Sequence, residues 1–159
     1  SCKLRKQGDG YSRIEQGIKI LKKKIIYEKK YWSINSSHDG YLKNYGVIHD
    51  RQIEFYPEKN KIIGRDNLIK KKNFKVSNFE IRFHLQPNVK VMKTQDGKSI
   101  LIEINDEGWK FGCENEKFEI ETGLYFGKKN SYTENKNIFI SGMTQKENQT
   151  IKWELIKIT

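Results

Sequence analysis

The chain has 159 residues and a formal net charge of +11 at pH 7, from 31 basic and 20 acidic side chains. This length is enough for one domain with its own core and without disulfide staples. The sequence has no apolar run near the about 20 residues that span a bilayer, no visible secretory signal, and no phosphate loop or Gly-x-Ser-x-Gly elbow. A membrane span and two common kinds of catalytic motif are therefore excluded.

The composition favours an all-β protein. The sequence contains no alanine, the best helix former, but has 21 isoleucines, 8 tyrosines and 8 phenylalanines, which suit a pleated, half-buried surface. The basic residues are 26 lysines and only 5 arginines. Because nucleic-acid readers rely on arginine for bidentate contacts, this balance favours a solvated lysine surface or an acidic polysaccharide partner over RNA or DNA.

Residues 1–30 are predicted to be a poorly defined lead-in segment. Ile18 and Ile20, and then Ile25 and Ile26, indicate one or two short strands, interrupted by the lysines at 22–24. No clean 3.6-residue pattern supports a helix there.

Residues 31–159 are predicted to form one β-sandwich domain. Odd-numbered residues from Val47 to Phe55 share one strand face, the segment 57–61 is a turn, and Lys61–Leu68 returns as a hairpin. Strict alternation over Phe79–Gln86 is the clearest half-buried strand in the sequence.

Further strands follow at similar spacing, separated by turn signals. They are centred on Val89–Val91, Ile100–Ile104, Trp109–Cys113, Phe118–Thr122, Asn137–Ser141 and Thr150–Ile158, with turns at Asp96-Gly97 and Asp106–Gly108. In the last strand, Ile156 and Ile158 change faces, which predicts a β-bulge. This spacing is typical of an antiparallel sandwich of two stacked sheets.

Five polar side chains are the candidates for a substrate cleft or for its scaffold: His38, His49, Arg51, Arg82 and His84. His49 and Arg51 lie on the strand face that should meet the core. A buried arginine must be paired, and the candidate partners are Asp39 or Asp66. Arg82 and His84 should point away from the core, into solvent or toward another domain or an acidic sugar. A zinc site built from the three histidines is a poor fit, because they are far apart and not at ligand spacing.

The two cysteines, Cys2 and Cys113, have no metal-ligand spacing. Either two free thiols or one disulfide is compatible with the sequence.

Four motifs in order resemble the C-terminal sheet domain of heparinase II/III-like proteins, over about residues 31–105. They are Ser37–Tyr41 (SHDGY), Tyr45–Arg51 (YGVIHDR), Ile63–Leu68 (IGRDNL) and Arg82–Leu85 (RFHL) with Pro87. One departure is Gln86, where relatives often carry a second histidine before the proline.

The resemblance implies a parent protein with an N-terminal α/α toroid that cleaves uronic-acid-containing polysaccharide, a glycosaminoglycan or alginate, by β-elimination. It also implies a bacterial periplasmic or envelope location. In the family, toroid residues and an early sandwich motif resembling His-Ala-His-Ala-Asp supply the chemistry, and that motif is not in this sequence. We therefore expect a truncated C-terminal domain with no catalytic residues, no metal and no cofactor of its own. Any structural zinc in the parent would have upstream ligands.

Two other functions stay open at this point. The chain could be a non-catalytic carbohydrate-binding or structural sandwich, or, less favourably, a basic nucleic-acid-binding module.

Overall fold

The computed structural model describes residues 3–129 and 131–159 of the chain. Within these residues the chain is built almost entirely of β-strands, with one short helix and one 3-10 turn. The elements in order are β1 Lys3–Lys6, β2 Ser12–Gln16, β3 Ile20–Glu28, β4 Tyr31–Tyr41, α1 Leu42–Tyr45, β5 Val47–Tyr56, η1 Pro57–Lys59, β6 Lys61–Lys70, β7 Asn78–His84, β8 Lys90–Lys93, β9 Ile100–Ile104, β10 Glu107–Cys113, β11 Lys117–Lys128, β12 Ser131–Met143 and β13 Asn148–Lys157. No helix in the described part of the chain is long and apolar enough to cross a membrane.

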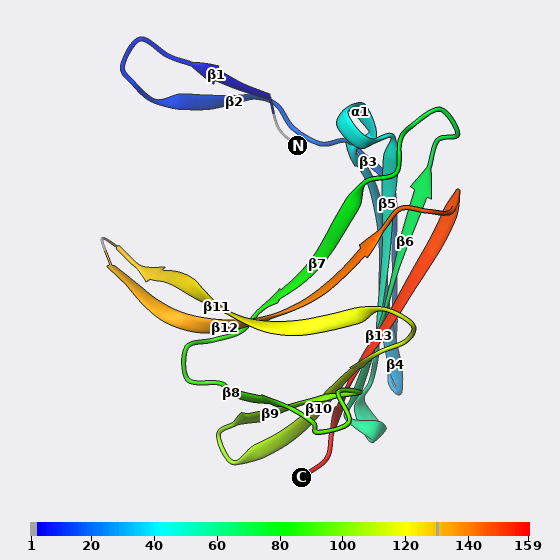
Figure 1. Cartoon of the computed structure of the whole chain (residues 1–159), viewed down its shortest axis with the longest axis vertical. Helices are drawn as coiled ribbons and strands as arrows, with labels where there is room; N and C mark the ends of the chain where they lie inside the picture. The colour runs from blue at the N-terminus through cyan, green and yellow to red at the C-terminus, as the bar shows by residue number, and fades with distance from the viewer. Residues whose placement is uncertain (1–2, 130) are drawn as a thin grey trace.

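Two antiparallel sheets make up the sandwich. The larger sheet has the strand order β3-β4-β5-β6-β13-β10-β9-β8, and the smaller has the order β11-β12-β7. The smaller sheet lies across the middle of the larger one, and the β1–β2 hairpin projects separately near the N-terminus (Figure 1). The predicted all-β antiparallel sandwich is confirmed.

The core lies between the two sheets and follows from alternation along their strands. On β7, Ile81 is buried and Phe83 packs against the core, while Arg82 between them is exposed. The Phe83 ring lies 4.8 Å from the Trp153 ring and 5.0 Å from the Phe111 ring, centroid to centroid. Edge-on contacts of this kind add to the stabilisation from apolar burial. The fully or nearly fully buried apolar side chains are Val47, Leu68, Ile81, Val89, Ile100, Ile102, Phe111, Phe118, Ile138, Ile140, Ile151 and Trp153.

The start of β5 is fixed by a glycine. Gly46 ends α1 in the left-handed region, with φ of 65°, and its own N–H bonds back to the carbonyl of Leu42. A Cβ at this position would also overlap the ring of Phe74. Glycine is therefore required twice here, for the backbone angle and for space. The result is that β5 begins at Val47 with alternate side chains facing the smaller sheet.

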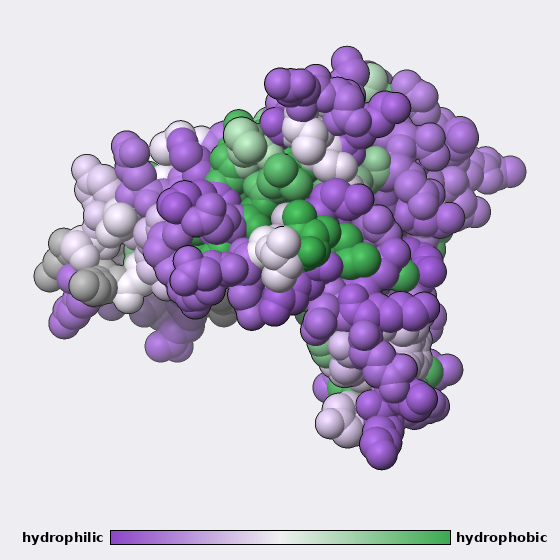
Figure 2. Space-filling view, turned by 90° about the horizontal axis from the view of Figure 1, so that it is seen from below, coloured by the Kyte–Doolittle hydropathy of each residue, from purple (hydrophilic) through white to green (hydrophobic). Residues whose placement is uncertain are grey.

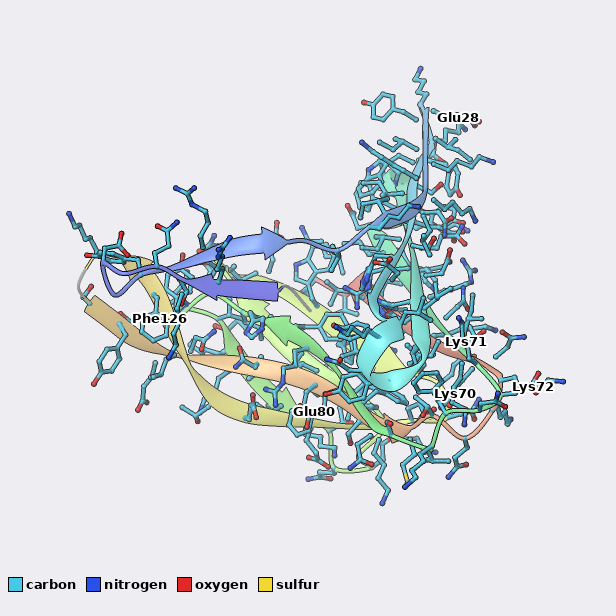
Figure 3. All side chains as sticks on the ribbon, turned by 90° about the horizontal axis from the view of Figure 1, so that it is seen from above. Glu28, Lys70, Lys71, Lys72, Glu80 and Phe126 are labelled. Carbon is cyan, nitrogen blue, oxygen red and sulfur yellow. The ribbon has the colours of Figure 1, made fainter. Side chains whose placement is uncertain are left out.

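One hairpin of each sheet extends beyond the region where the two sheets overlap. Figure 3 shows the β3–β4 hairpin, marked by Glu28, and the β11–β12 hairpin, marked by Phe126, reaching away from the centre in different directions. Large apolar side chains are exposed near both tips, including Tyr27 at 86% and Phe126 at 72%. These ends of the sheets are not covered by any described part of this chain.

A second uncovered apolar surface lies at the end of the molecule that carries the C-terminus. Seen from below, apolar side chains gather in the middle of the face with hydrophilic ones around them (Figure 2). The strands β8, β9 and β10 and the C-terminus lie at this end (Figure 1). A shallow groove of about 620 Å³ there is lined by Val91, Ile102, Trp109 and Ile158, among others.

Two details of the sequence-based prediction are wrong. Strand β3 runs without interruption through the lysines at 22–24, paired with β4. Strand β13 keeps a regular register with both neighbours, so the predicted bulge is absent, and Ile156 lies on the outer face between Lys61 and Lys110. The aliphatic stems of these lysines give the isoleucine a partly buried position. The domain boundary at residue 30 stays a prediction.

Candidate functional site

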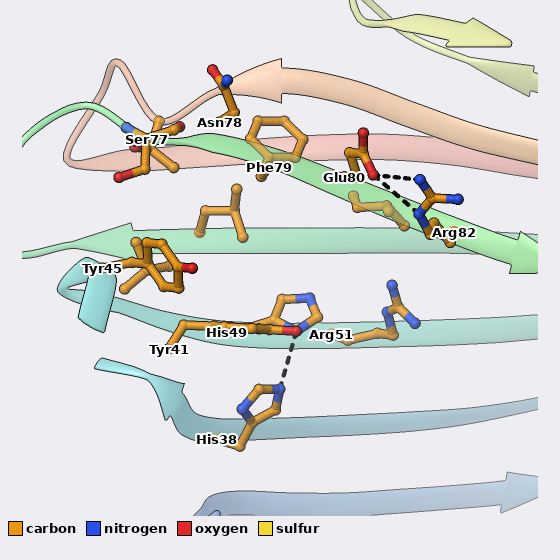
Figure 4. A pocket seen from close by; sticks show the side chains of 14 residues that line it. His38, Tyr41, Tyr45, His49, Arg51, Ser77, Asn78, Phe79, Glu80 and Arg82 are labelled. Carbon is orange, nitrogen blue, oxygen red and sulfur yellow. Dashed lines mark hydrogen bonds and ion pairs between the residues drawn. The ribbon is translucent and has the colours of Figure 1, made fainter. Parts of the chain in front are cut away.

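A cleft opens where β7 diverges from the strands β4 and β5 of the larger sheet (Figure 4). Its volume is about 570 Å³. One wall is formed by β4 and β5, and the other by the first half of β7. The lining side chains are those of His38, Tyr41, Tyr45, Val47, His49, Arg51, Leu68, Ser77, Asn78, Phe79, Glu80, Ile81, Arg82 and Thr144. The cleft thus combines imidazoles, guanidinium groups and aromatic rings.

A buried carboxylate organises one wall of the cleft. Asp66 on β6 is completely buried and accepts three side-chain hydrogen bonds. His49 Nε2 and Arg51 Nε both donate to its Oδ1 at 2.6 Å, and Trp153 Nε1 donates to its Oδ2 at 2.8 Å. The strand register places these groups together, because Arg51 lies directly opposite Asp66 on the neighbouring strand.

The hydrogen-bond chain continues from His49 to His38. His38 Nε2 lies 3.2 Å from His49 Nδ1, and the Gly40 N–H donates to His38 Nδ1 at 3.1 Å. Since His38 Nδ1 accepts, the proton of a neutral His38 is on Nε2 and is donated to His49 Nδ1. The His49 proton is then on Nε2 and is donated to Asp66. Both ring nitrogens of each histidine are thus engaged within the protein.

Within this hydrogen-bond network, the protein environment favours a neutral His38 and a charged Asp66. Burial lowers the pKa of His38 below its ordinary value, and the nearby His49 lowers it further. For Asp66, burial by itself raises the pKa, but the hydrogen bonds from His49 and Arg51 and the charge of Arg51 outweigh it and hold the pKa below its ordinary value. The network therefore pairs a buried carboxylate with the guanidinium of Arg51.

Arg51 is a more accessible donor to Asp66 than His49, whose side chain is 14% exposed. The side chain of Arg51 is 36% exposed, and Figure 4 shows its guanidinium directed from β5 toward the strand that carries Glu80 and Arg82. Only Nε is bonded to Asp66, and the two terminal Nη atoms have no bonding partner among the described residues. The rings of Tyr41 and Tyr45, 6.5 Å apart, lie near the same opening and are about half exposed.

The β7 wall is closed by an ion-pair cluster. Arg82 donates through Nε and Nη2 to Glu80, the second at 2.7 Å, and through Nη1 to Glu121 on β11. Its guanidinium also lies 5.4 Å from the centre of the Phe139 ring. The pairing raises the pKa of Arg82, first through Glu80 and then through Glu121. Each of the three guanidinium nitrogens of Arg82 thus already donates to a carboxylate of the protein.

Four of the five candidate residues surround the cleft, and one does not. His38, His49, Arg51 and Arg82 line it, whereas His84 lies further along β7 and bonds through Nδ1 to Asn137 Oδ1 at 3.1 Å. Arg82 and His84 are exposed, as alternation predicts. Their roles, and those of the other three, stay predictions.

Asp66 was a predicted partner of Arg51, whereas the contribution of Trp153 was not predicted. Of the two candidate partners of Arg51, Asp66 is confirmed, and Asp39 instead accepts the backbone N–H of Lys19 at 2.8 Å. The indole bond from Trp153 links β13 to β6 across 87 positions of sequence. The only signal for it was that Trp153 alternates with charged residues and so faces the core.

The described residues do not offer a metal site. No three His, Cys, Asp or Glu side chains among them could hold a metal ion. His38, His49 and Asp66 bond to one another in a line rather than converging on a common point, so they do not fit zinc. Cys113 carries a free thiol, and Cys2 lies outside the described residues.

Comparison with known proteins relates the sequence and the fold to one group. The family model described as "Heparinase II/III-like, C-terminal" matches residues 6–154, while no curated protein matches the chain significantly. The crystal structure of heparan sulfate lyase HepC from Pedobacter heparinus has a TM-score of 0.73 at 10% identity, covering 94% of this chain and 23% of that one. The heparinase III-BT4657 gene product gives 0.66 at 10% identity, covering 90% and 22%.

A form of that gene product with methylated lysines gives a TM-score of 0.67 at 11% identity, covering 94% of this chain and 22% of that one. At such identities the structural likeness shows the fold alone. The chain spans less than a quarter of the length of these solved structures.

Proposed function

This chain belongs to the heparinase II/III-like C-terminal family, and on that basis we propose that it is the sandwich part of a lyase that cleaves uronic-acid-containing polysaccharide. The observation that carries the proposal is the family match over residues 6–154. A heparan sulfate lyase among the structures of the same fold supports a glycosaminoglycan as the substrate class.

The proposed reaction is β-elimination. A base removes the proton at C5 of a uronate, whose carboxylate stabilises the negative charge that develops. The bond from C4 to the glycosidic oxygen then breaks, an acid protonates the leaving oxygen, and a C4–C5 double bond remains. The base and the acid must each have a nitrogen or oxygen free to face the sugar.

We assign that proton transfer to a part of the parent other than these 159 residues. In the cleft, both ring nitrogens of His38 and of His49 are bonded within the protein. Either histidine would have to leave this network before it could act as the base on a substrate. The sequence also lacks alanine, and so cannot contain the His-Ala-His-Ala-Asp motif. The contribution of this chain is then to hold the polysaccharide and to support a neighbouring domain.

The proposed partner within the parent is an N-terminal α/α toroid. Exposed apolar surface at the β3–β4 tip and in the groove beside Trp109 is of the kind that a neighbouring domain covers. By family analogy, the parent is a bacterial protein of the periplasm or cell envelope, and any structural zinc would be bound by its upstream part.

The proposal is tested by comparing this chain with the longer parent protein that is proposed above. Both are incubated with heparan sulfate and, separately, with alginate, and the absorbance of the unsaturated uronide is followed. We expect turnover by the longer protein and none by the 159-residue chain. Turnover by the chain alone, or no turnover of any uronate polymer by the longer protein, would overturn the proposal.

A non-catalytic carbohydrate-binding function is the second candidate. It is favoured by one observation: the rings of Tyr41 and Tyr45 and the guanidinium group of Arg51 line the open side of the cleft, a combination suited to binding sugars. Retention of the longer protein on an acidic polysaccharide without any turnover would establish it in place of the lyase.

A further inference from the structure

Among the arginine and histidine side chains of the cleft, only Arg51 has terminal nitrogens without a partner among the described residues. His38 and His49 are engaged with each other, with Gly40 and with Asp66, and Arg82 is engaged with two carboxylates. The two Nη groups of Arg51 have no partner among the described residues and lie at the cleft surface. A ligand that enters the cleft thus meets a free guanidinium edge.

We propose that this edge is a binding site for the oxyanion of an acidic sugar, a carboxylate or a sulfate group. The two Nη groups of Arg51 donate to two oxygens of the anion, and the rings of Tyr41 and Tyr45 contact the sugar ring. The choice of a sugar as ligand rests on the function proposed above. The choice of an anion rests on the geometry of Arg51 and its surroundings.

The guanidinium group of Arg51, a planar fork of donors, is held in a fixed orientation. Asp66 binds Arg51 at Nε and is itself held by Trp153 and His49, so neither the carboxylate nor the guanidinium is free to swing. A planar guanidinium matches the two oxygens of a carboxylate or sulfate in a bidentate arrangement. Because the fork is already oriented, less conformational entropy is lost when the anion binds.

Further polar side chains are arranged in a row beside Arg51. Lys23, Ser36 and Arg51 are in register on β3, β4 and β5, so they project from the same face of the sheet. Two strand spacings separate Lys23 from Arg51, about 10 Å. Lys23 is exposed and can meet a second anionic group along the same polymer.

The local charge sets the expected strength of binding. Asp66 offsets Arg51, and Glu80 and Glu121 together exceed the charge of Arg82, so the cleft itself is not strongly positive. The net charge of +11 on the whole chain still attracts a polyanion at long range. We therefore expect weak binding of a single acidic residue, with selectivity that comes from the fork.

The test is a titration of the 159-residue chain with short oligosaccharides, followed by NMR chemical shifts. Three ligands of equal length are used: an unsulfated oligouronate, a sulfated heparin fragment and a neutral glucose oligomer. The key variant is Arg51→Lys, which keeps the charge but loses the fork. Its matched control is Arg65→Lys on the outer face of β6, where Arg65 pairs with Glu54 at 2.8 Å.

We expect both acidic ligands, but not the neutral one, to bind the native chain. Arg51→Lys should weaken binding about tenfold, the contribution of one charge-assisted hydrogen bond, and Arg65→Lys should leave it unchanged. Binding of only one acidic ligand would identify the anion as carboxylate or as sulfate. Equal weakening by both variants, or equally tight binding of the neutral oligomer, would overturn the proposal.

If Arg51→Lys does not fold, the side-chain signals of the native protein decide. The Nη–H signals of Arg51 should shift on titration while those of Arg82 stay in place, and the reverse pattern would overturn the site. The outcome is separate from that of the turnover assay. Failure of the acidic ligands to bind removes this site even if the longer protein is a lyase. Binding by the chain, together with no turnover by the longer protein, keeps the site and removes the lyase.

Discussion

Replacing Asp66 by asparagine removes one charge from the centre of the molecule while keeping nearly the same shape. The carboxylate accepts from three donors, two on Oδ1 and one on Oδ2. An asparagine has one oxygen and one NH2 group at these positions. In one orientation its NH2 group faces the N–H of Trp153, and in the other it faces those of His49 and Arg51, so one or two donors lose their acceptor.

The magnitude follows from the loss of the counter-charge. Removing one partner of a buried ion pair costs about 3–5 kcal/mol. Because the Arg51 side chain is 36% exposed, its charge is partly solvated, and we expect a value near the lower limit, about 3 kcal/mol. With a urea dependence of about 2 kcal/mol/M for a domain of this size, the unfolding midpoint should fall by about 1.5 M.

The assay is urea unfolding followed by tryptophan fluorescence, and Asp50→Asn is the matched control. Asp50 accepts from two neutral amides through Oδ1, while its Oδ2 lies 3.9 Å from Lys22. An asparagine can keep the amide bonds, so this control should cost less than about 1 kcal/mol. A midpoint for Asp66→Asn within 0.3 M or so of the native value, or equal losses in the two variants, would refute the reasoning.

Three further predictions concern the core, a titration and the thiol. Gly64→Ala would place a Cβ inside the indole of Trp153, so we expect the free energy of unfolding to fall by about 2–4 kcal/mol; an unchanged urea midpoint would contradict this. Because the pKa of His38 is lowered in the folded state, the unfolded chain binds the proton first as the pH falls through 6.5. The free energy of unfolding should therefore decrease as the pH is lowered from about 7.5 to 5.5. His38→Asn should flatten this part of the plot of the urea midpoint against pH. A plot as steep as that of the native protein would contradict a lowered pKa of His38. Burial, together with Glu116, raises the pKa of Cys113 to about 12, so in a Cys2→Ser variant iodoacetamide at pH 8 should label the folded thiol over tenfold more slowly than the urea-unfolded one; equal rates would show that the thiol is open.

Alternation along the chain was sufficient to predict the half-buried strands. On β7, apolar side chains at every second position predict a strand with one face toward the core and one toward solvent. The structure shows this alternation of exposed and buried side chains. The same signal is absent from β3, where almost every side chain is exposed. Alternation reports burial rather than strand formation, so an edge strand that extends past its partner sheet cannot be recognised by it.

The pairing of Arg51 with Asp66 was within reach of the sequence. A hairpin that turns at Pro57–Asn60 places residue 51 opposite residue 66, and the predicted turn already implied this register. The indole of Trp153 was not within reach, because β13 pairs with β6 over a long sequence separation that no turn specifies. The exact position of a turn was also not predicted, as Asn105 and Asp106 show. They form the β9–β10 turn with positive φ angles, one position before the predicted one, since both residue types tolerate this conformation.

One proton NMR sample that contains the 159-residue chain and an acidic oligouronate tests most directly whether this chain binds the polymer without cleaving it. Broadened sugar signals report binding, and a vinylic proton signal reports elimination. We expect broadening that persists for days without any vinylic signal. A growing vinylic signal would show that proton transfer resides in this chain, and sharp, unchanged sugar signals would show that the cleft does not hold the polymer.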